Sequence, residues 1–224
     1  MVLARRPART DTLPRVLLTG FEPFGGDVLN PSWLAARALH GRRIANHRIV
    51  AGCLPTVFGR SLGELRALIE RHQPRLVICI GQAGGRAALS LERIAINVDD
   101  ARIADNTGAR PVDEPIAPGG PAAYFTRLPI KAMLLALQQA GIAAEVSQTA
   151  GTFVCNHVFY GLLHELSTKH ALRFVRGGFI HVPWLPEQGV PSMALADVVR
   201  GLRVALRTAL TVDQDISLSA GALD

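Results

Sequence analysis

Short β-branched runs alternate along this chain with longer segments of helical periodicity, and this alternation constrains the fold more than any other feature. Such strands, separated by helices, form a largely parallel sheet with helices packed on it. The expected strands are 15–19, 48–53, 75–80, 92–98, 144–148 and 174–182. The expected helices are 32–39, 57–71, 122–140, 155–168 and 193–210, with Pro129 kinking the third or starting a fresh helix within it. The pattern therefore predicts an α/β fold.

No internal repeat or break in composition divides the chain, so we expect a single α/β domain over residues 15–212. Residues 1–14 are basic and lack the apolar stretch of a secretory signal, and we expect them to form a disordered arm. Residues 213–224 are expected to form a tail. The segment 99–121 is rich in Asp, Pro and Gly, which predicts a long irregular excursion of the kind that is often functional.

The net charge of +6 raises the question of nucleic-acid binding, which needs a basic surface. The arginines are spread along the chain, occur at most in short pairs, and alternate with acidic residues. We therefore expect no nucleic-acid partner. No apolar run approaches the ~20 residues that a membrane helix requires, so we expect no membrane partner either.

The three cysteines, Cys53, Cys79 and Cys155, are odd in number and widely spaced. They form neither a disulfide framework nor a set with metal-ligand spacing, so we expect no metal and a reducing, cytoplasmic location. Cys53 and Cys79 lie inside apolar strands and are interpreted as buried small apolar residues.

Cys155 differs because it follows a turn at Ala150-Gly151 and begins a helical pattern. The partial positive charge of a helix N-terminus favours a thiolate and lowers the pKa of a thiol. The free amides there can also hold the oxyanion that forms when a thiolate attacks a carbonyl. Two interpretations of Cys155 fit its position equally well: a reactive thiol, or a buried small apolar residue.

A cysteine nucleophile needs a base, and the chain has seven histidines. His181 ends an apolar strand, and sites in open α/β sheets form beyond the carboxyl ends of strands. A hydrogen-bonded core histidine is the alternative for His181. His157 is a poor partner for Cys155, because residues two apart on a helix do not face each other. The others are expected on the surface: His40, His47, His72, His164 and His170.

The base in turn needs an acid that orients it, and Glu22 and Glu92 are the candidates. Glu22 follows the first strand in the sequence GFEPFGG, and Glu92 follows the glycine-rich GQAGGR turn at the start of an expected strand. Spacing does not choose between them. Neither glycine-rich turn matches a phosphate-binding loop.

Two further features suggest a ligand. Phe21 and Phe24 lie in a loop after the first strand, where a pair of rings could flank a flat apolar ligand or simply fill the core. Arg102 is interpreted as a structural ion-pair residue unless the excursion folds over the site.

Six segments of this chain, taken together and in order, closely resemble the type I pyroglutamyl peptidases, or pyrrolidone-carboxylate peptidases. They extend from about residue 16 to residue 188. The segments are LLTGFEPFGGDVLNPSW, GQAGGR, LERIAINVDDARIADN, PVDEPIAPGGPAAYFTRLPIKAM, QTAGTFVCNHVFYGLLHEL and GGFIHVPWLPEQ. Each is long and rich in unusual residues, so the combined match is highly specific.

The resemblance implies a three-layer α/β/α sandwich with a mostly parallel central sheet, and a cysteine peptidase with a catalytic triad. It assigns the nucleophile to Cys155, the base to His181 and the third member to Glu92. It also implies four substrate-binding residues: Phe21 and Phe24 around the pyrrolidone ring, Gln82 near the substrate, and Arg102 in the lining of the pocket.

The implied activity is that of an exopeptidase that hydrolyses the amide bond after an N-terminal pyroglutamyl residue through a thioester. The resemblance implies no cofactor, and a homo-oligomer such as a tetramer. Two rivals remain: a related hydrolase or nucleoside-processing enzyme, and a non-catalytic protein that binds cyclic amino acids. Turnover of a pyroglutamyl amide and sensitivity to thiol reagents separate them from the peptidase.

Overall fold

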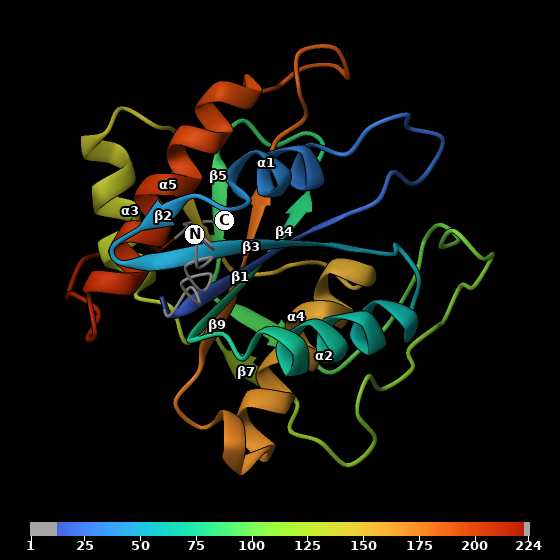
Figure 1. Ribbon diagram of the computed structural model, residues 1–224. Helices are drawn as coiled ribbons and strands as arrows, with labels where there is room; N and C mark the ends of the chain where they lie inside the picture. Colours follow the sequence, from blue (N-terminus) through green and yellow to red (C-terminus); the bar gives the residue numbers. More distant parts are fainter. Residues whose placement is uncertain (1–12, 222–224) are drawn as a thin grey trace, which may run out of the picture.

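The computed structural model describes residues 13–221 and contains a seven-stranded sheet between two layers of helices (Figure 1). The strand order is β2-β3-β1-β4-β9-β5-β8. The strands are β1 Arg15–Phe21, β2 Arg43–Ile44, β3 His47–Leu54, β4 Leu76–Gln82, β5 Leu89–Glu92, β8 Ala144–Ser147 and β9 Arg176–Val182. Residues 1–12 of the expected basic arm lie outside the described residues.

The four central strands, β3, β1, β4 and β9, run parallel to one another. Strand β5 pairs antiparallel with β9, and β8 pairs parallel with β5, so this end of the sheet runs in the opposite direction. At the other end, the short β2 pairs antiparallel with β3. The sheet is therefore mostly parallel, as predicted.

The helices pack on both faces of the sheet, because alternate residues of its buried strands are apolar on both sides. One face is covered by α1 Pro31–Leu39, α3 Ile130–Gln139 and α5 Leu195–Thr211, and the other by α2 Arg60–His72 and α4 Val154–Thr168 (Figure 1). Two separate apolar clusters result: Ile78, Ile80 and Ile180 belong to the first, and Cys79 and Phe179 to the second. The three-layer α/β/α prediction is confirmed.

The expected helix at 122–140 is wrong in its first half. Residues Ala123–Phe125 form a strand, β7, and the helix α3 begins only at Ile130, directly after Pro129. Strand β7 pairs with β6, Ile94–Ile96, in a separate two-stranded sheet. Pairing partners from distant parts of the chain therefore override a local helical pattern.

The expected strand at 92–98 is also divided. Glu92 ends β5 and lies in the main sheet, whereas residues 94–96 turn away into the small sheet. Glu92 is thus the last residue of a strand in the main sheet, and not the first residue of a strand as expected.

The excursion at 99–121 leaves β6 and returns to β7 with little regular structure. An isolated antiparallel β-bridge between Asp99 and Glu114 joins the outgoing and returning parts of the excursion. It is also tied to the loop before α4, where the Thr152 hydroxyl donates to the Asp100 carbonyl at 2.7 Å.

The described part of the tail packs on the chain. The carboxylate of Asp215 accepts from the backbone N–H groups of Lys131 and Ala132, at 3.0 and 2.9 Å. These groups belong to the first turn of α3, which has no side-chain cap from its own N-cap residue. Asp215 therefore satisfies donors that the helix leaves free.

Arginines that are spread along the sequence gather on one surface of the fold. Two neighbouring hollows of about 380 and 400 Å³ share Arg43 and Arg203 in their linings. Arg42 borders one, and Arg200 and Arg207 border the other. The absence of a nucleic-acid partner stays a prediction. Within residues 13–221, no helix is long and apolar enough to cross a membrane.

Candidate active site

Three neighbouring strands bring the side chains of the site to one face of the sheet. Gly81 on β4 pairs with His181 on β9, and paired residues point to the same face. Ser90 on β5 lies opposite His181. Because side chains alternate along a strand, Glu92 points to the same face as Ser90. This face is the one that α2 and α4 cover, since Phe179 belongs to their apolar cluster.

His181 and Glu92 form a buried pair on this face. Nδ1 of His181 lies 2.7 Å from Oε1 of Glu92. His181 is 4% exposed and Glu92 is fully buried. The carboxylate accepts the Nδ1 proton and orients the ring, which leaves Nε2 as the nitrogen that can exchange a proton.

The sulfur of Cys155 lies near His181 because α4 begins beside Gly81. Cys155 is the second residue of α4, and the N-cap residue, Phe153, provides no side-chain cap. An ideal Cβ placed on Gly81 would lie 2.7 Å from the sulfur. Gly81 and His181 are paired on adjacent strands, which are about 4.8 Å apart in a sheet. The thiol and the imidazole are therefore neighbours on the same face.

Gly81 was not identified from the sequence, and its missing side chain makes room for the Cys155 sulfur. We expect Gly81→Ala to lower kcat/KM by about 10- to 100-fold, because the new Cβ displaces the sulfur and misplacement by about 1 Å has an effect of this size. The same Cβ would lie 2.8 Å from Cζ of Phe179, so the ring must move as well. Steady-state kinetics on the amide substrate that the sequence resemblance implies measures the loss.

Gly63→Ala is the matched control, because a Cβ on Gly63 meets no heavy atom within 4 Å. Gly63 lies inside α2, where alanine is favoured over glycine by up to about 1 kcal/mol. This variant should keep full activity. Wild-type kinetics in Gly81→Ala would show that the sulfur does not need the space above the strand.

Burial sets the protonation of the three thiols. It raises the pKa of Cys155 to about 12, with a further increase from the negative charge of Glu92. The positive charge of Arg86 acts in the opposite direction. Burial also raises the pKa of Cys79 to about 12 and, together with Glu22, that of Cys53 to about 11. Cys79 is buried as expected, but the interpretation of Cys53 as a buried residue is wrong, because its side chain lies on an exposed part of β3. The direction of the Cys155 pKa shift is opposite to the lowering expected at a helix N-terminus, and burial is its largest cause.

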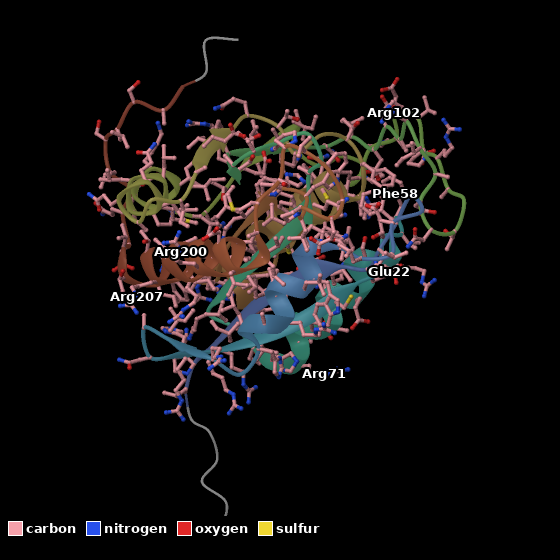
Figure 2. The ribbon with its side chains drawn as sticks, turned by 90° about the horizontal axis from the view of Figure 1, so that it is seen from above. Glu22, Phe58, Arg71, Arg102, Arg200 and Arg207 are labelled. Atoms are coloured by element: carbon pink, nitrogen blue, oxygen red, sulfur yellow. The ribbon has the colours of Figure 1, made fainter. Side chains whose placement is uncertain are left out.

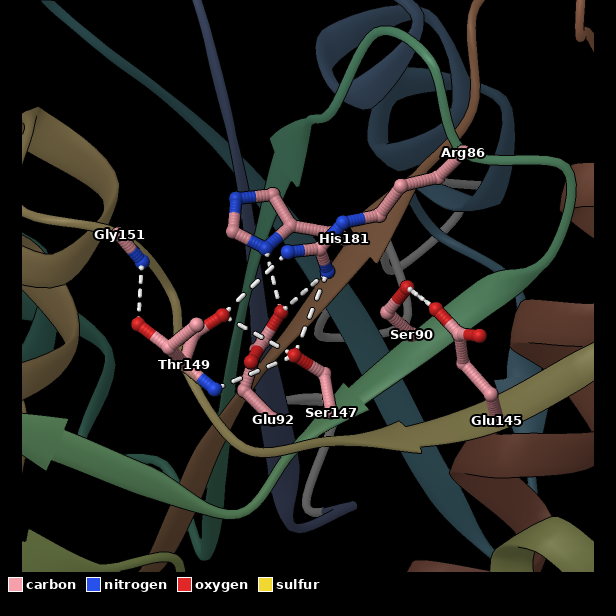
Figure 3. A network of polar contacts seen from close by, with 8 residues as sticks. All are labelled: Arg86, Ser90, Glu92, Glu145, Ser147, Thr149, Gly151 and His181. Atoms are coloured by element: carbon pink, nitrogen blue, oxygen red, sulfur yellow. Dashed lines mark hydrogen bonds and ion pairs between the residues drawn. The ribbon is translucent and has the colours of Figure 1, made fainter. Parts of the chain in front are cut away.

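Arg86 is a second residue that the sequence did not single out. Its NH1 group lies 2.8 Å from Oε1 of Glu92, the same oxygen that binds His181 (Figure 3). It comes from the GQAGGR turn, where an arginine is usually solvated. Nothing in the sequence distinguishes it from the many other arginines of the chain.

Glu22, the other candidate acid, lies in a different network. Its Oε1 accepts from the Thr56 backbone N–H at 3.1 Å and from Nδ2 of Asn106 at 3.0 Å. Asn106 belongs to the excursion, so Glu22 ties this segment to the loop after β1. Glu92, and not Glu22, is the acid that contacts His181.

His157 is buried, and both of its ring nitrogens bind groups other than Cys155. Its Nδ1 lies 2.7 Å from Oδ2 of Asp99, and its Nε2 accepts from the Gly59 backbone N–H at 3.0 Å. Nε2 therefore carries no proton in this arrangement. His157 anchors the excursion on α4, which agrees with its rejection as the base.

The aromatic side chains near the site have different neighbours. Phe24 lies against Phe153, with ring centroids 6.0 Å apart, and Phe58 packs edge-on against Phe153 at 5.4 Å. Phe21 is only 2% exposed and lies 6.4 Å from Phe179. Phe153 and Phe58 were missed, although the position of Phe153 just before the helix that carries Cys155 was a usable signal.

Gln82 follows Gly81 at the end of β4 and belongs to a polar cluster at the rim. Its Nε2 donates to Oδ2 of Asp27 at 2.9 Å. Gln188 donates to the same Asp27 oxygen and to Oε1 of Gln82, both at 3.2 Å. Gln82 ends β4, whereas Asp27 and Gln188 lie in the loops that follow β1 and β9.

Arg102 is exposed, and its backbone carbonyl accepts from NH2 of Arg110 at 2.8 Å. In Figure 2, Arg102 lies on the same side of the view as Phe58 and Glu22, and opposite Arg200 and Arg207. Within the described chain, no group of His, Cys, Asp or Glu is arranged to hold a metal ion. The need for no cofactor stays a prediction.

Comparison with known proteins links this geometry to one family. The family model described as pyroglutamyl peptidase matches residues 14–212. A pyrrolidone-carboxylate peptidase of Cupriavidus taiwanensis is 57% identical over 216 residues, which cover 94% of this chain and 100% of that protein.

Two solved structures share the fold. The crystal structure of pyroglutamyl peptidase I from Bacillus amyloliquefaciens is 50% identical, with a TM-score of 0.90 over 92% of this chain and 100% of that one. A mutant pyrrolidone carboxyl peptidase from Pyrococcus furiosus is 42% identical, with a TM-score of 0.84 over 88% and 98% of the two chains.

Proposed function

This chain belongs to the pyroglutamyl peptidase family, and we propose that Cys155, His181 and Glu92 are its nucleophile, its base and its orienting acid. The enzyme is a cysteine peptidase that hydrolyses the amide bond after an N-terminal pyroglutamyl residue through a thioester. The observation that carries the residue assignment is the buried contact between His181 and Glu92, at 2.7 Å. His181 lies on β9, beside Gly81 of β4, and the Cys155 sulfur lies against Gly81.

The raised pKa of Cys155, about 12, means that the resting thiol is protonated near neutral pH. His181 therefore acts as a general base: Nε2 takes the thiol proton as sulfur attacks the pyroglutamyl carbonyl. The free N–H groups at the start of α4 are oriented to stabilise the oxyanion.

The same imidazole completes both halves of the reaction. His181 gives its proton to the departing amine as the C–N bond breaks, which leaves the thioester. It then takes a proton from water as the water oxygen attacks, and returns this proton to the sulfur when pyroglutamate leaves. Glu92 holds the ring in one tautomer and stabilises its charged form throughout.

Four further residues are proposed to bind the substrate: Phe21, Phe24, Gln82 and Arg102. The pyrrolidone ring is flat and neutral, so an apolar slot beside the Phe24 ring suits it. Such a slot rejects open glutamyl or glutaminyl ends, because their charged amine would lose its hydration there. Phe21 supports the slot from within the core, and Gln82 offers an amide at the rim.

We also propose that the enzyme acts in the cytoplasm as a homo-oligomer, such as a tetramer. Cys53, Cys79 and Cys155 are all free thiols, which suits a reducing compartment. Light scattering coupled to size-exclusion chromatography measures the assembly, and a monomer at micromolar concentration would contradict it.

The wild-type enzyme should release the fluorophore from a pyroglutamyl coumarin amide, and iodoacetamide should abolish this activity. Alkylation of Cys155 blocks the sulfur that forms the thioester. Because Cys53 is exposed and also reacts, the variant Cys53→Ser is the matched control. It should keep both the activity and its loss on alkylation. Full activity after mass spectrometry shows complete modification of Cys155 would exclude the mechanism.

A further inference from the structure

One oxygen of Glu92 accepts two hydrogen bonds, and only one of them comes from the base. Oε1 lies 2.7 Å from Nδ1 of His181 and 2.8 Å from NH1 of Arg86 (Figure 3). The Glu92 side chain is fully buried, whereas that of Arg86 is 29% exposed. Arg86 therefore reaches from the partly solvated GQAGGR turn into the interior of the site.

The state of the second carboxylate oxygen makes the ion pair with Arg86 important for the stability of the buried Glu92 carboxylate. Oε2 is buried and has no hydrogen-bond partner among residues 13–221. An ionised carboxylate that is removed from water is costly unless it is paired with a cation. The arginine is the permanent cation of the pair, because a guanidinium stays protonated at all working pH values. His181 is charged only during part of the cycle.

Arg86 also contacts the segment that leads to the nucleophile. Its NH2 group donates to the Thr149 carbonyl at 3.3 Å, and NH1 lies 3.5 Å from Oγ of Ser147. Ser147 in turn bonds the Thr149 carbonyl at 3.0 Å. This segment ends β8 and continues through the turn before α4. One guanidinium thus joins the orienting acid to the chain that positions Cys155.

We propose that Arg86 is a positioning residue of the peptidase, which holds the Glu92 carboxylate in place for His181 and supplies the positive charge that the buried site needs. The proposal rests on the assignment of Cys155, His181 and Glu92 to the reaction. Arg86 acts through Glu92 and through the field at the sulfur, without contact with the reacting bond.

The charge of Arg86 acts on the thiol as well as on Glu92. The charged and titratable groups that influence the thiol are Glu92, Arg86 and Cys79, and among them only Arg86 lowers the pKa of Cys155. The positive charge therefore favours ionisation of the thiol at lower pH.

Arg86→Met tests the proposal, because it keeps much of the side-chain length and removes the charge. We expect kcat to fall by about 10- to 100-fold, the size of effect seen when partners that orient a catalytic ligand are removed. The acid limb of the pH–rate profile should move to higher pH. Alkylation of Cys155 by iodoacetamide at pH 8, followed by peptide mass spectrometry, should become several-fold slower.

Arg86→Lys separates charge from geometry. Lysine restores the positive charge but not the forked donor, so the acid limb and the alkylation rate should return toward wild type while kcat recovers only in part. Arg71→Met is the matched control, since Arg71 is an exposed arginine on α2. It should leave all three measurements unchanged.

Two outcomes would overturn the role of Arg86: wild-type kinetics in Arg86→Met, or a lower kcat with an unmoved acid limb and an unchanged alkylation rate. The second outcome would describe a merely structural residue. If Arg86→Met does not fold, the same three measurements on Arg86→Gln decide. An active Cys155→Ala variant would instead refute the triad itself, so the two failures are distinguishable.

Discussion

Cys155→Ala is expected to abolish the release of pyroglutamate, with a fall in kcat of about 10⁴- to 10⁶-fold, the range found when a triad nucleophile is removed. The thioester cannot form without the sulfur, and the remaining oxyanion donors act only on direct attack by water. The substrate should still bind, because the residues proposed to hold the pyrrolidone ring are unchanged. A discontinuous assay with high enzyme concentration measures the residual rate.

Cys79→Ala is an informative comparison for this variant. Cys79 is fully buried on β4, two residues before Gly81 on the same strand, and its loss tests packing next to the site without removing the nucleophile. It should lower stability and leave a measurable kcat. Residual activity of Cys155→Ala above a few parts per thousand, in protein with a wild-type melting temperature, would rule out the sulfur as nucleophile.

His181→Ala should be nearly as damaging near neutral pH, because the thiol then has no base. Its pH dependence gives the sharper test. With a Cys155 pKa of about 12, the thiolate fraction rises about tenfold per pH unit over the range in which the protein is folded. The residual rate of His181→Ala should rise with pH at about that slope, whereas the wild-type rate levels off. A kinetic profile from pH 7 to 9 measures both.

Two other variants define the specificity of this effect. His170→Ala changes an exposed histidine and should behave as wild type. Glu92→Gln keeps the size of the orienting side chain and should leave more activity than His181→Ala. A flat pH dependence in His181→Ala would show that another group removes the thiol proton.

The pattern of strands and helices was largely predictable because it depends on local periodicity. The buried strand β4 and the amphipathic helix α2 both lie within a few residues of their expected bounds. The failures arise where a distant partner decides the structure. Residues 123–125 become strand β7 because residues 94–96 are available to pair with them, and no local signal reports that pairing.

The site shows the same division. His181 was a candidate from its position at the end of an apolar strand, and Cys155 from its place at the start of a helix. Spacing could not choose between Glu22 and Glu92, because the antiparallel register of β5 on β9 is a property of the folded sheet. Arg86 and Gly81 could not be predicted for the same reason. The pKa of Cys155 was misjudged because burial depends on packing.

The position of Glu92 near one margin of the sheet has a consequence for how this protein can lose its activity. Among the strands of residues 13–221, β8 alone lies beyond β5, and β5 meets β9 through a short antiparallel contact. If these two outer strands detach, the apolar cluster under α2 and α4 loses none of its members, yet the imidazole loses the carboxylate that steers it. Loss of catalytic activity would then indicate that β5 and β8 have detached from the sheet. A molecule in that state would be inactive although its overall helix content is native.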